Sequence, residues 1–357
     1  MAKLLPELDE SLQTVPLMEL EGPSGPGIGL FRDSGGPGLV VATAYQGRGA
    51  TALDALRVQR ALGSRAPSLA VATTGHHFSM ATLAGLIPDE GLKWMLVEGV
   101  ASGNFLVAFG FAEERPGSGV LSPSMTATEG PDGVRISGVT RPYGLARSMN
   151  LLIAGVMVSR ADGPGEEPAV VVVPADSEGV SVDGTGADSE QVTLDDVEVP
   201  PEMLVRTSAL DGQLDVLLTA GFAWYRLLMT GCHLGAAGAL VERVLLDDRV
   251  PESERVQLLV ETEGAMSAAE GVARRIDDGL DESTLADSLY VRYRVQDALS
   301  RVVPRAAELL GDLGSTTSDE VGHLATCANG LALHPPARFR MTGPPAAHLV
   351  DGPLTIA

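Results

Sequence analysis

The stretch from Phe105 to Val205 decides the fold, because it is a run of short strands between two helical flanks. It opens with LVAFGFAEERPGSG (Leu106–Gly119), an apolar strand that runs into a glycine-rich turn. It closes with PAVVVVPADSEGVSV (Pro168–Val182) and LDDVEVPPEMLV (Leu194–Val205). Short β-branched segments separated by Gly- and Pro-rich turns are typical of a barrel or sandwich. The expected strands are Asn104–Phe111, Gly119–Ala127, Gly133–Val139, Leu151–Val158, Ala169–Val173 and Val192–Val199.

The turn Arg115–Gly119 is the first candidate ligand site. Its backbone N–H groups and the Ser118 hydroxyl suit an anion such as a pyrophosphate. The turn leads into a strand and not into a helix, so it is not a dinucleotide-binding GxGxxG motif. Most Gly-Ser turns hold no ligand, and a plain structural turn stays an open interpretation.

Helices are expected on both sides of this stretch. Residues 1–40 are rich in Gly and Pro and favour loop with short ordered pieces. Near-helical apolar spacing predicts helices at Thr51–Leu62, Ala70–Leu86 and Gly91–Ser102. Four longer ones, with short loops typical of an antiparallel bundle, are expected at Leu214–Asp247, Pro251–Asp278, Glu282–Leu313 and Asp319–Leu333. The predicted domains are 1–103 (mainly helical), 104–205 (β) and 206–357 (helical bundle).

Composition limits the possible partners. The 357 residues carry a formal net charge of −22, with 25 basic against 47 acidic residues. Such a surface repels phosphate backbones and anionic lipid, so neither nucleic acid nor a membrane is an expected partner. Two cysteines in a chain of this length favour a reducing compartment, and the N-terminus has no secretory pattern. We therefore expect a cytoplasmic protein.

Two His-containing pairs invite a catalytic or metal interpretation. Neighbouring residues on a helix point about 100° apart, so His76 and His77 cannot chelate one ion together. For the same reason Cys232 and His233 are a poor thiol–imidazole pair, and Gly231 and Gly235 beside them indicate close helix packing. We expect these histidines to lie in the core or line a pocket, and we expect no metal site.

The order of segments resembles that of the acyl-CoA dehydrogenases, which have a helical start, a middle β-domain and a C-terminal four-helix bundle. Leu106–Gly119 resembles that family's Thr-Glu-Pro…Gly-Ser flavin turn, and Leu194–Val205 resembles its Asp-Asp-Val…Val-Pro signature. The resemblance implies an α+β multidomain fold over roughly residues 30–354. Three further motifs match in the same order: Thr43–Thr51, Arg305–Leu324 and Leu349–Leu354.

The resemblance implies an oxidoreductase that acts on an acyl thioester of CoA or of an acyl carrier protein. In that family a carboxylate removes the α-proton while FAD accepts the β-hydride. The usual base position holds Asp351 in this chain. An alternative base position on the first long helix holds Tyr225, followed by the matching Arg226.

Several positions that contact the flavin in that family are replaced here. The Thr of the flavin turn is Ala112, and the Lys-x-Trp-x-Thr segment reads Thr140–Gly144. The Arg-x-x-Phe-Gly motif is absent, with only Arg249 nearby, and the Gln before Gly-Gly is Glu308. We therefore expect FAD to bind weakly or not at all. By resemblance the cofactor-binding positions are Glu113, Gly117, Ser118, Tyr143, Arg249, Glu308, Gly311 and Gly314.

Two interpretations stay open. The first is a divergent flavin-dependent acyl-thioester dehydrogenase of specialised metabolism, with Asp351 as the base. The second is a protein of this fold that has lost FAD and performs non-redox chemistry on an acyl chain, or that serves an active paralogue as a subunit of a hetero-oligomer. Cofactor pockets shared between subunits in the family imply a homodimer or homotetramer.

Overall fold

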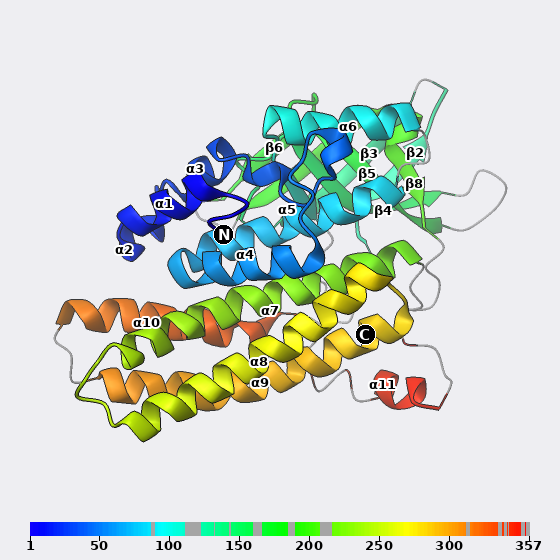
Figure 1. Cartoon of the computed structure of the whole chain (residues 1–357). Coiled ribbons are helices and arrows are strands. Elements are labelled where there is room, and N and C mark those ends of the chain that lie inside the picture. The colour runs from blue at the N-terminus through cyan, green and yellow to red at the C-terminus, as the bar shows by residue number, and fades with distance from the viewer. Residues whose placement is uncertain are drawn as a thin grey trace. The chain divides into compact units, whose positions relative to one another are not determined.

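We describe a computed structural model of the whole chain (Figure 1). It describes residues 1–86, 90–110, 123–131, 133–142, 144–159, 166–184, 190–207, 216–311, 315–334, 338, 341, 343–350 and 354. The chain divides into two compact units. The first comprises Met1–Gly36, Ala50–Thr74 and Phe222–Arg338, and the second comprises Pro37–Gly49, Gly75–Gly221 and Phe339–Ala357. The domain boundaries expected from the sequence stay a prediction.

Three short helices begin the first unit, where mostly loop is expected from the sequence. They are α1 (Pro6–Thr14), α2 (Leu17–Leu20) and α3 (Gly27–Asp33). Leu8 and Leu12 lie one turn apart on α1 and are buried, which supplies its packing face. The glycines and prolines of this region lie largely between the helices. Because they are so frequent, the sequence favours loop here even though a short apolar pattern is present.

The helix α4 (Ala52–Arg65) follows, and backbone N–H groups of its first turn find hydrogen-bond acceptors. The Thr51 hydroxyl accepts a hydrogen bond from the Asp54 N–H (3.1 Å), as an N-cap does. A carboxylate from another helix, Asp277, accepts from the Ala52 N–H (2.6 Å). The negative charge at this end also complements the helix dipole.

Long helices form the rest of the first unit: α7 (Val216–Leu245), α8 (Glu252–Asp278), α9 (Glu282–Leu310) and α10 (Ser315–Asn329), which continues into η4 (Gly330–Leu333). They run lengthwise beside one another in Figure 1 as the expected helical bundle. The Asp281 carboxylate starts α9 by accepting from the Thr284 N–H (2.7 Å). None of the described helices is both long enough and apolar enough to cross a lipid bilayer.

The second unit combines helices with the sheet. Its helical segments include η2 (Thr43–Tyr45), α6 (Glu90–Gly103), α11 (Gly343–His348) and the later part of α5 (Pro67–Leu86), which begins in the first unit; η1 (Gly36–Gly38) and η3 (Pro201–Met203) are short turns. Its strands are β1 (Val107–Gly110), β2 (Thr126–Glu129), β3 (Val134–Thr140), β4 (Leu151–Ser159), β5 (Glu166–Pro174), β6 (Val180–Asp183), β7 (Gln191–Val199) and β8 (Leu204–Arg206).

All eight described strands belong to one mixed sheet. Its order is β6-β7-β3-β2-β4-β5-β8, and β1 pairs with β4 outside this path. The β1–β4 and β2–β4 pairings are parallel and the other pairings are antiparallel. All residues of β4 except Met157 and Ser159 are buried, so side chains on both faces of this central strand are covered. The parallel register places Gly110, at the end of β1, opposite Ala154.

Candidate active site

Most of the positions expected to bind flavin or act as base lie outside the described residues. This group contains the base candidate and five cofactor positions: Asp351, Glu113, Gly117, Ser118, Tyr143 and Gly314. Their assignments stay predictions. The described candidates are Tyr225, Arg226, Arg249, Glu308 and Gly311.

Arg249 and Glu308 each contact a neighbour in sequence. The Arg249 Nε and Nη2 atoms donate to the two carboxylate oxygens of Asp247, at 2.9 and 2.8 Å. These hydrogen bonds lower the pKa of Asp247 to about 2. Glu308 accepts from Arg305 Nη1 (2.7 Å), which neutralises the acid, and Gly311 directly follows the last residue of α9. Arg249, Glu308 and Gly311 all lie in the first unit.

Arg226 has no adequate partner for its buried charge among the described residues. The side chain lies on α7 and is 1 % exposed. Its Nη1 donates to the Phe222 carbonyl at 3.5 Å, a weak bond, while Nε and Nη2 have no hydrogen-bond partner there. Burial first, and then the nearby charge of Arg292, lower the pKa of Arg226 to about 9. The guanidinium therefore stays protonated at neutral pH in surroundings that oppose its charge.

A second arginine approaches from α9. Arg292 is buried and donates through Nη2 to the carbonyl oxygens of Leu331 (3.1 Å) and His334. Its guanidinium lies 5.5 Å from the ring centroid of Tyr293, a cation–π distance. Tyr225 and Tyr293 both act electrostatically on the two arginines. Arg226, Arg292, Tyr225 and Tyr293 together are called the cationic cluster below.

Two neutral histidines flank the cationic cluster. The rings of His233 on α7 and His334 after η4 lie 5.1 Å apart between centroids. The His233 Nδ1–H donates to the Cys327 carbonyl oxygen (2.7 Å). Burial is the main cause that lowers the pKa of His233 to about 4 and that of His334 to about 3. Both rings are uncharged at neutral pH, so the positive charge in this region belongs to the arginines.

Arg292 and Tyr293 were missed by sequence reasoning, which named only Tyr225 and Arg226. A signal for Arg292 is present, because the apolar stripe of α9 includes Leu285, Leu289 and Leu299. Arg292 falls on that stripe, where a charged residue has no core role. Its contact with α7 residues is remote in sequence, and no local pattern shows it.

The other polar pairs singled out from the sequence have structural explanations. Cys232 Sγ lies 3.3 Å from the Thr74 hydroxyl, and burial raises the pKa of the Cys232 thiol to about 12. His76 accepts from the Val107 N–H at Nδ1 (3.0 Å), and its Nε2 lies 2.8 Å from the Pro37 carbonyl. Burial lowers the pKa of His76 to about 4, so it is a neutral residue that anchors the start of β1.

The Thr140 side chain packs against the Gly110 backbone where β1 and β3 end. The Thr140 hydroxyl is buried and has no hydrogen-bond partner among the described residues. It lies where a Cβ on Gly110 would come within 2.5 Å, so glycine is required there. Thr140 begins the segment that corresponds to the flavin cover in the resembling family. A buried hydroxyl without a partner among the described residues, beside a strand end without a side chain, fits the hydrogen-bonding edge of a flavin.

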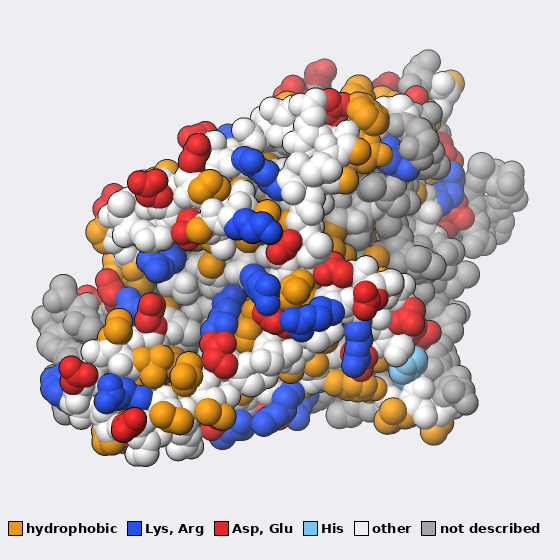
Figure 2. Space-filling view, viewed as in Figure 1, with side chains coloured by type: hydrophobic (Ala, Val, Ile, Leu, Met, Phe, Trp, Pro, Cys, Tyr) orange, Lys and Arg blue, Asp and Glu red, His pale blue; other side chains and the backbone are white. Residues whose placement is uncertain are grey.

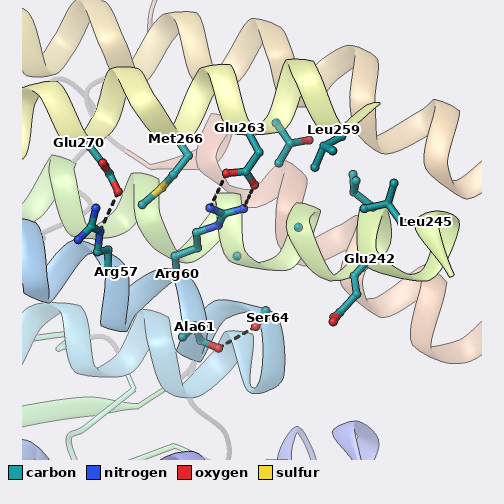
Figure 3. A pocket seen from close by; sticks show the side chains of 14 residues that line it. Arg57, Arg60, Ala61, Ser64, Glu242, Leu245, Leu259, Glu263, Met266 and Glu270 are labelled. Carbon is teal, nitrogen blue, oxygen red and sulfur yellow. Dashed lines mark hydrogen bonds and ion pairs between the residues drawn. The ribbon is translucent and has the colours of Figure 1, made fainter. Parts of the chain in front are cut away.

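The first unit also has an open groove of about 440 Å³ between α4, α7 and α8. Figure 3 shows Arg57 and Arg60 reaching from α4 toward Glu270 and Glu263 of α8, with Arg57 Nε–Glu270 Oε1 at 2.8 Å. Basic and acidic side chains are likewise interleaved over this face in Figure 2. Both arginines of the groove are paired with its glutamates Glu270 and Glu263, and none of the predicted site residues lines it, so we do not assign the active site there.

Comparison with known proteins places these features in context. No protein-family model matches the chain. The chain is 39 % identical over 367 residues to isobutylamine N-hydroxylase of Streptomyces viridifaciens, covering 99 % of this chain and 97 % of that one. The FMN-bound dibenzothiophene monooxygenase TdsC from Paenibacillus sp. A11-2 has the same fold, with a TM-score of 0.81, 19 % identity and coverage of 99 % and 98 %. A glutaryl-coenzyme A dehydrogenase in its glutaryl-CoA complex does as well, with a TM-score of 0.80, 20 % identity and coverage of 99 % and 96 %.

Proposed function

Because the chain belongs to the acyl-CoA dehydrogenase family, we propose that it is a flavin-dependent oxidoreductase of that fold and that it N-hydroxylates a small primary amine. The observation that carries this proposal is the 39 % identity to an isobutylamine N-hydroxylase over nearly the whole of both chains. Similarity of fold alone supports little about chemistry, and the structures near 20 % identity do not distinguish hydroxylation from dehydrogenation.

The reaction consumes an amine, dioxygen and a reduced flavin, and yields a hydroxylamine, water and oxidised flavin. Reduced flavin, when bound, supplies the two electrons, and one oxygen atom of dioxygen ends on the amine nitrogen. The nitrogen must offer its lone pair, so the reactive form is the neutral amine. An alkylammonium resembles a lysine side chain, with a pKa of about 10.4 in water. The protein therefore has to favour deprotonation.

The cationic cluster suits that requirement. A positive charge nearby disfavours an ammonium ion and lowers its pKa. Arg226 carries such a charge in a buried place, and no described carboxylate hydrogen-bonds to its guanidinium. An amine nitrogen beside Tyr225 and Arg226 would be held neutral, and the Tyr225 hydroxyl is able to exchange a proton with it. The alternative base position of the acyl dehydrogenases carries a tyrosine here, so it offers no carboxylate for α-proton removal.

The Thr140 hydroxyl is the described group that we assign to the flavin. Glu113, Gly117, Ser118 and Tyr143 complete the proposed flavin site by resemblance alone. Because several contacts of the family are replaced, we expect a flavin that exchanges with solution and is not retained through purification. Each lost hydrogen bond to a buried or charged group costs on the order of 1–3 kcal/mol.

Acyl-thioester dehydrogenation with Asp351 as base is the second candidate. It is favoured by the shared fold with glutaryl-coenzyme A dehydrogenase and by the carboxylate at the usual base position. A flavin-free protein of this fold is the remaining alternative. The three differ in what they consume: dioxygen and reduced flavin, an oxidised flavin with an electron acceptor, or neither.

The test supplies each set of substrates to the same preparation. The protein is mixed with reduced FAD or FMN, dioxygen and isobutylamine, and the hydroxylamine is measured by mass spectrometry with ¹⁸O₂ as tracer. A parallel assay offers glutaryl-CoA or isobutyryl-CoA with oxidised FAD and a ferricenium acceptor. Incorporation of one ¹⁸O atom into the amine, reduced at least tenfold in Tyr225→Phe, is the expected result. Desaturation of the thioester without amine oxidation would reject hydroxylation in favour of the second candidate, and calorimetry without flavin binding would reject both.

A further inference from the structure

Three metal-ligating side chains that do not belong to the cationic cluster converge in the first unit. They are Glu21 after α2 and His323 and Cys327 on α10, called the Glu-His-Cys cluster here. The His323 Nε2 lies 2.8 Å from Glu21 Oε2 and 3.5 Å from Cys327 Sγ. All three ligand atoms lie within 4.8 Å of one another. Nothing in the proposed oxidation uses these groups.

The backbone holds the three side chains in this arrangement. His323 and Cys327 are four residues apart on α10 and so share one face. The Glu21 carboxylate is 2 % exposed and fixed from its other side, because it accepts from the Ser68 N–H (3.1 Å) and the Ser68 hydroxyl (2.6 Å) at the start of α5. The ligand atoms are therefore positioned by two separate elements and not by flexible surface chains.

Hydrogen bonding alone does not satisfy the Glu-His-Cys cluster. Both Glu21 and Cys327 approach the same ring nitrogen of His323, which has one proton or one lone pair to offer. If Nε2 carries the proton, it donates to Glu21 and the thiol keeps only a long contact. A cation between the three atoms would use a lone pair from each.

We propose that Glu21, His323 and Cys327 bind a zinc-like divalent cation, with solvent as the fourth ligand. Nitrogen, sulfur and carboxylate oxygen are the ligands zinc prefers, and a tetrahedral ion places them about 3.4–3.6 Å from one another. The observed Nε2–Sγ distance already fits, and the Nε2–Oε2 distance has to open by about 0.6 Å. Solvent has access, since 27 % of the His323 side chain is exposed. Binding releases the thiol proton to solution and leaves the His323 proton on Nδ1.

An ordinary ion pair is the competing explanation. Glu21 caps the start of α5 and also contacts His323, which accounts for two of the three contacts without a metal. It gives no role to the half-buried Cys327 thiol, which lies 3.5 Å from the same nitrogen. The two explanations differ in whether Cys327 takes part, and the chain contains a matched control, because its only other cysteine, Cys232, is buried against Thr74.

The experiment uses Co²⁺ as a spectroscopic probe on the full-length protein after removal of metals with a chelator. Thiolate–Co²⁺ coordination gives a charge-transfer absorption that carboxylate binding does not give, so loose binding to the acidic surface does not interfere. We expect the band to saturate at one Co²⁺ per chain and to disappear on addition of Zn²⁺. It should be lost in Cys327→Ser, weakened at least tenfold in His323→Asn, and unchanged in Cys232→Ser.

Thermal unfolding provides an independent readout, since the cation would join the end of α2 to α10. Zn²⁺ at about 100 times its dissociation constant should raise the Tm by about 3–8 °C in the wild type and in Cys232→Ser, but not in Cys327→Ser. Absence of the charge-transfer band in the wild type would overturn the proposal. So would a band that persists in Cys327→Ser, or one lost only in Cys232→Ser.

Discussion

The buried charge of Arg226 lowers the stability of the protein. A stability measurement therefore tests the functional role proposed for this residue. A buried charge without an ion-pair partner opposes folding, and replacing such groups by apolar residues of similar volume is often stabilising by about 1–4 kcal/mol. Residues of this kind persist where they serve activity. The described surroundings offer Arg226 one long hydrogen bond and a contact with the Phe222 ring at 5.2 Å.

We predict that Arg226→Met raises the free energy of unfolding by about 1–3 kcal/mol while it lowers turnover. Removing the positive charge raises the pKa of a bound amine, so the acid limb of the kcat–pH profile should move to higher pH by about one unit. Urea denaturation and the pH profile measure the two effects. Arg243→Met is the control, because Arg243 on the same helix pairs with Glu320 (2.7 Å) and should give no stabilisation. Destabilisation in Arg226→Met would show that its charge has a compensating partner.

The neutral histidines predict a pH dependence of stability. The folded-state pKa of His233 is about 4, below the usual 6.5, so the unfolded chain binds the proton more tightly. Its contribution is fully present above about pH 6.5 and is lost as the pH falls toward 4. Between pH 7 and pH 5 this histidine alone should remove about 2 kcal/mol of unfolding free energy. Urea titrations at several pH values should show a smaller dependence of the unfolding free energy on pH in His233→Gln than in the wild type.

Sequence reasoning found the α7 half of the cationic cluster and not the α9 half. Tyr225 and Arg226 follow from a motif match along one helix. Arg292 lies on α9, another helix of the same unit, and its charge acts on Arg226. It matters because its side chain is buried, which the sequence does not show directly. The pairing of Glu308 with Arg305 is local and could have been predicted from their helical spacing of three residues, whereas Arg249 and Asp247 pair in the turn after α7. Asp351 and the glycine-rich turn remain predictions, since they lie outside the described residues.

At the scale of the elements, glycines allow the helices α4 and α7 to pack in very close contact. A Cβ on Gly235 of α7 would lie 2.8 Å from the Gly63 Cα of α4, and one on Gly231 would lie 2.8 Å from Leu56 Cδ1. The sequence interpretation of Gly231 and Gly235 as packing glycines is therefore confirmed. This contact also positions the segment of α7 that carries Cys232 and His233.

We predict that Gly235→Ala destabilises the protein by about 2–4 kcal/mol, because backbone atoms of α4 have to move to admit the methyl group. The matched control is Gly264→Ala on α8, where a Cβ meets nothing within 4 Å. There the gain in helix propensity should stabilise by about 0.5–1 kcal/mol. Chemical denaturation of both variants measures the difference in sign. Equal effects at the two positions would mean that the helices separate without cost.

The long helices were predictable to within a few residues, and two of the short strands were not. The ranges expected for α8 and α9 begin within one residue of the observed starts, since apolar periodicity and an N-cap such as Asp281 define them. The strands β6 and β8 were not expected. Each has four residues or fewer, and pairing with β7 and β5 creates them more than their own propensity does.

At the scale of the whole molecule, the net charge of −22 opposes self-association, while an apolar stripe on α8 favours it. Val256, Leu259 and Val260 have helical spacing and are all exposed, with Val260 at 64 %. Leu246, just after α7, is 78 % exposed as well. Isolated apolar residues on a surface are ordinary, whereas a contiguous stripe on one helix is typical of an interface.

We therefore predict a homodimer, or a dimer of dimers, that uses the α8 stripe. Val260→Asp adds a charge to a face that has to be desolvated, and it should weaken the dimer at least tenfold. Raising the salt concentration screens the acidic surfaces and should tighten association in the wild type. Sedimentation and light scattering over micromolar concentrations measure both. Leu333→Asp is the control, since Leu333 is exposed in η4 and outside the stripe. A wild-type monomer at every salt concentration would remove the stripe from consideration, and a dimer unaffected by Val260→Asp would place the interface on another surface.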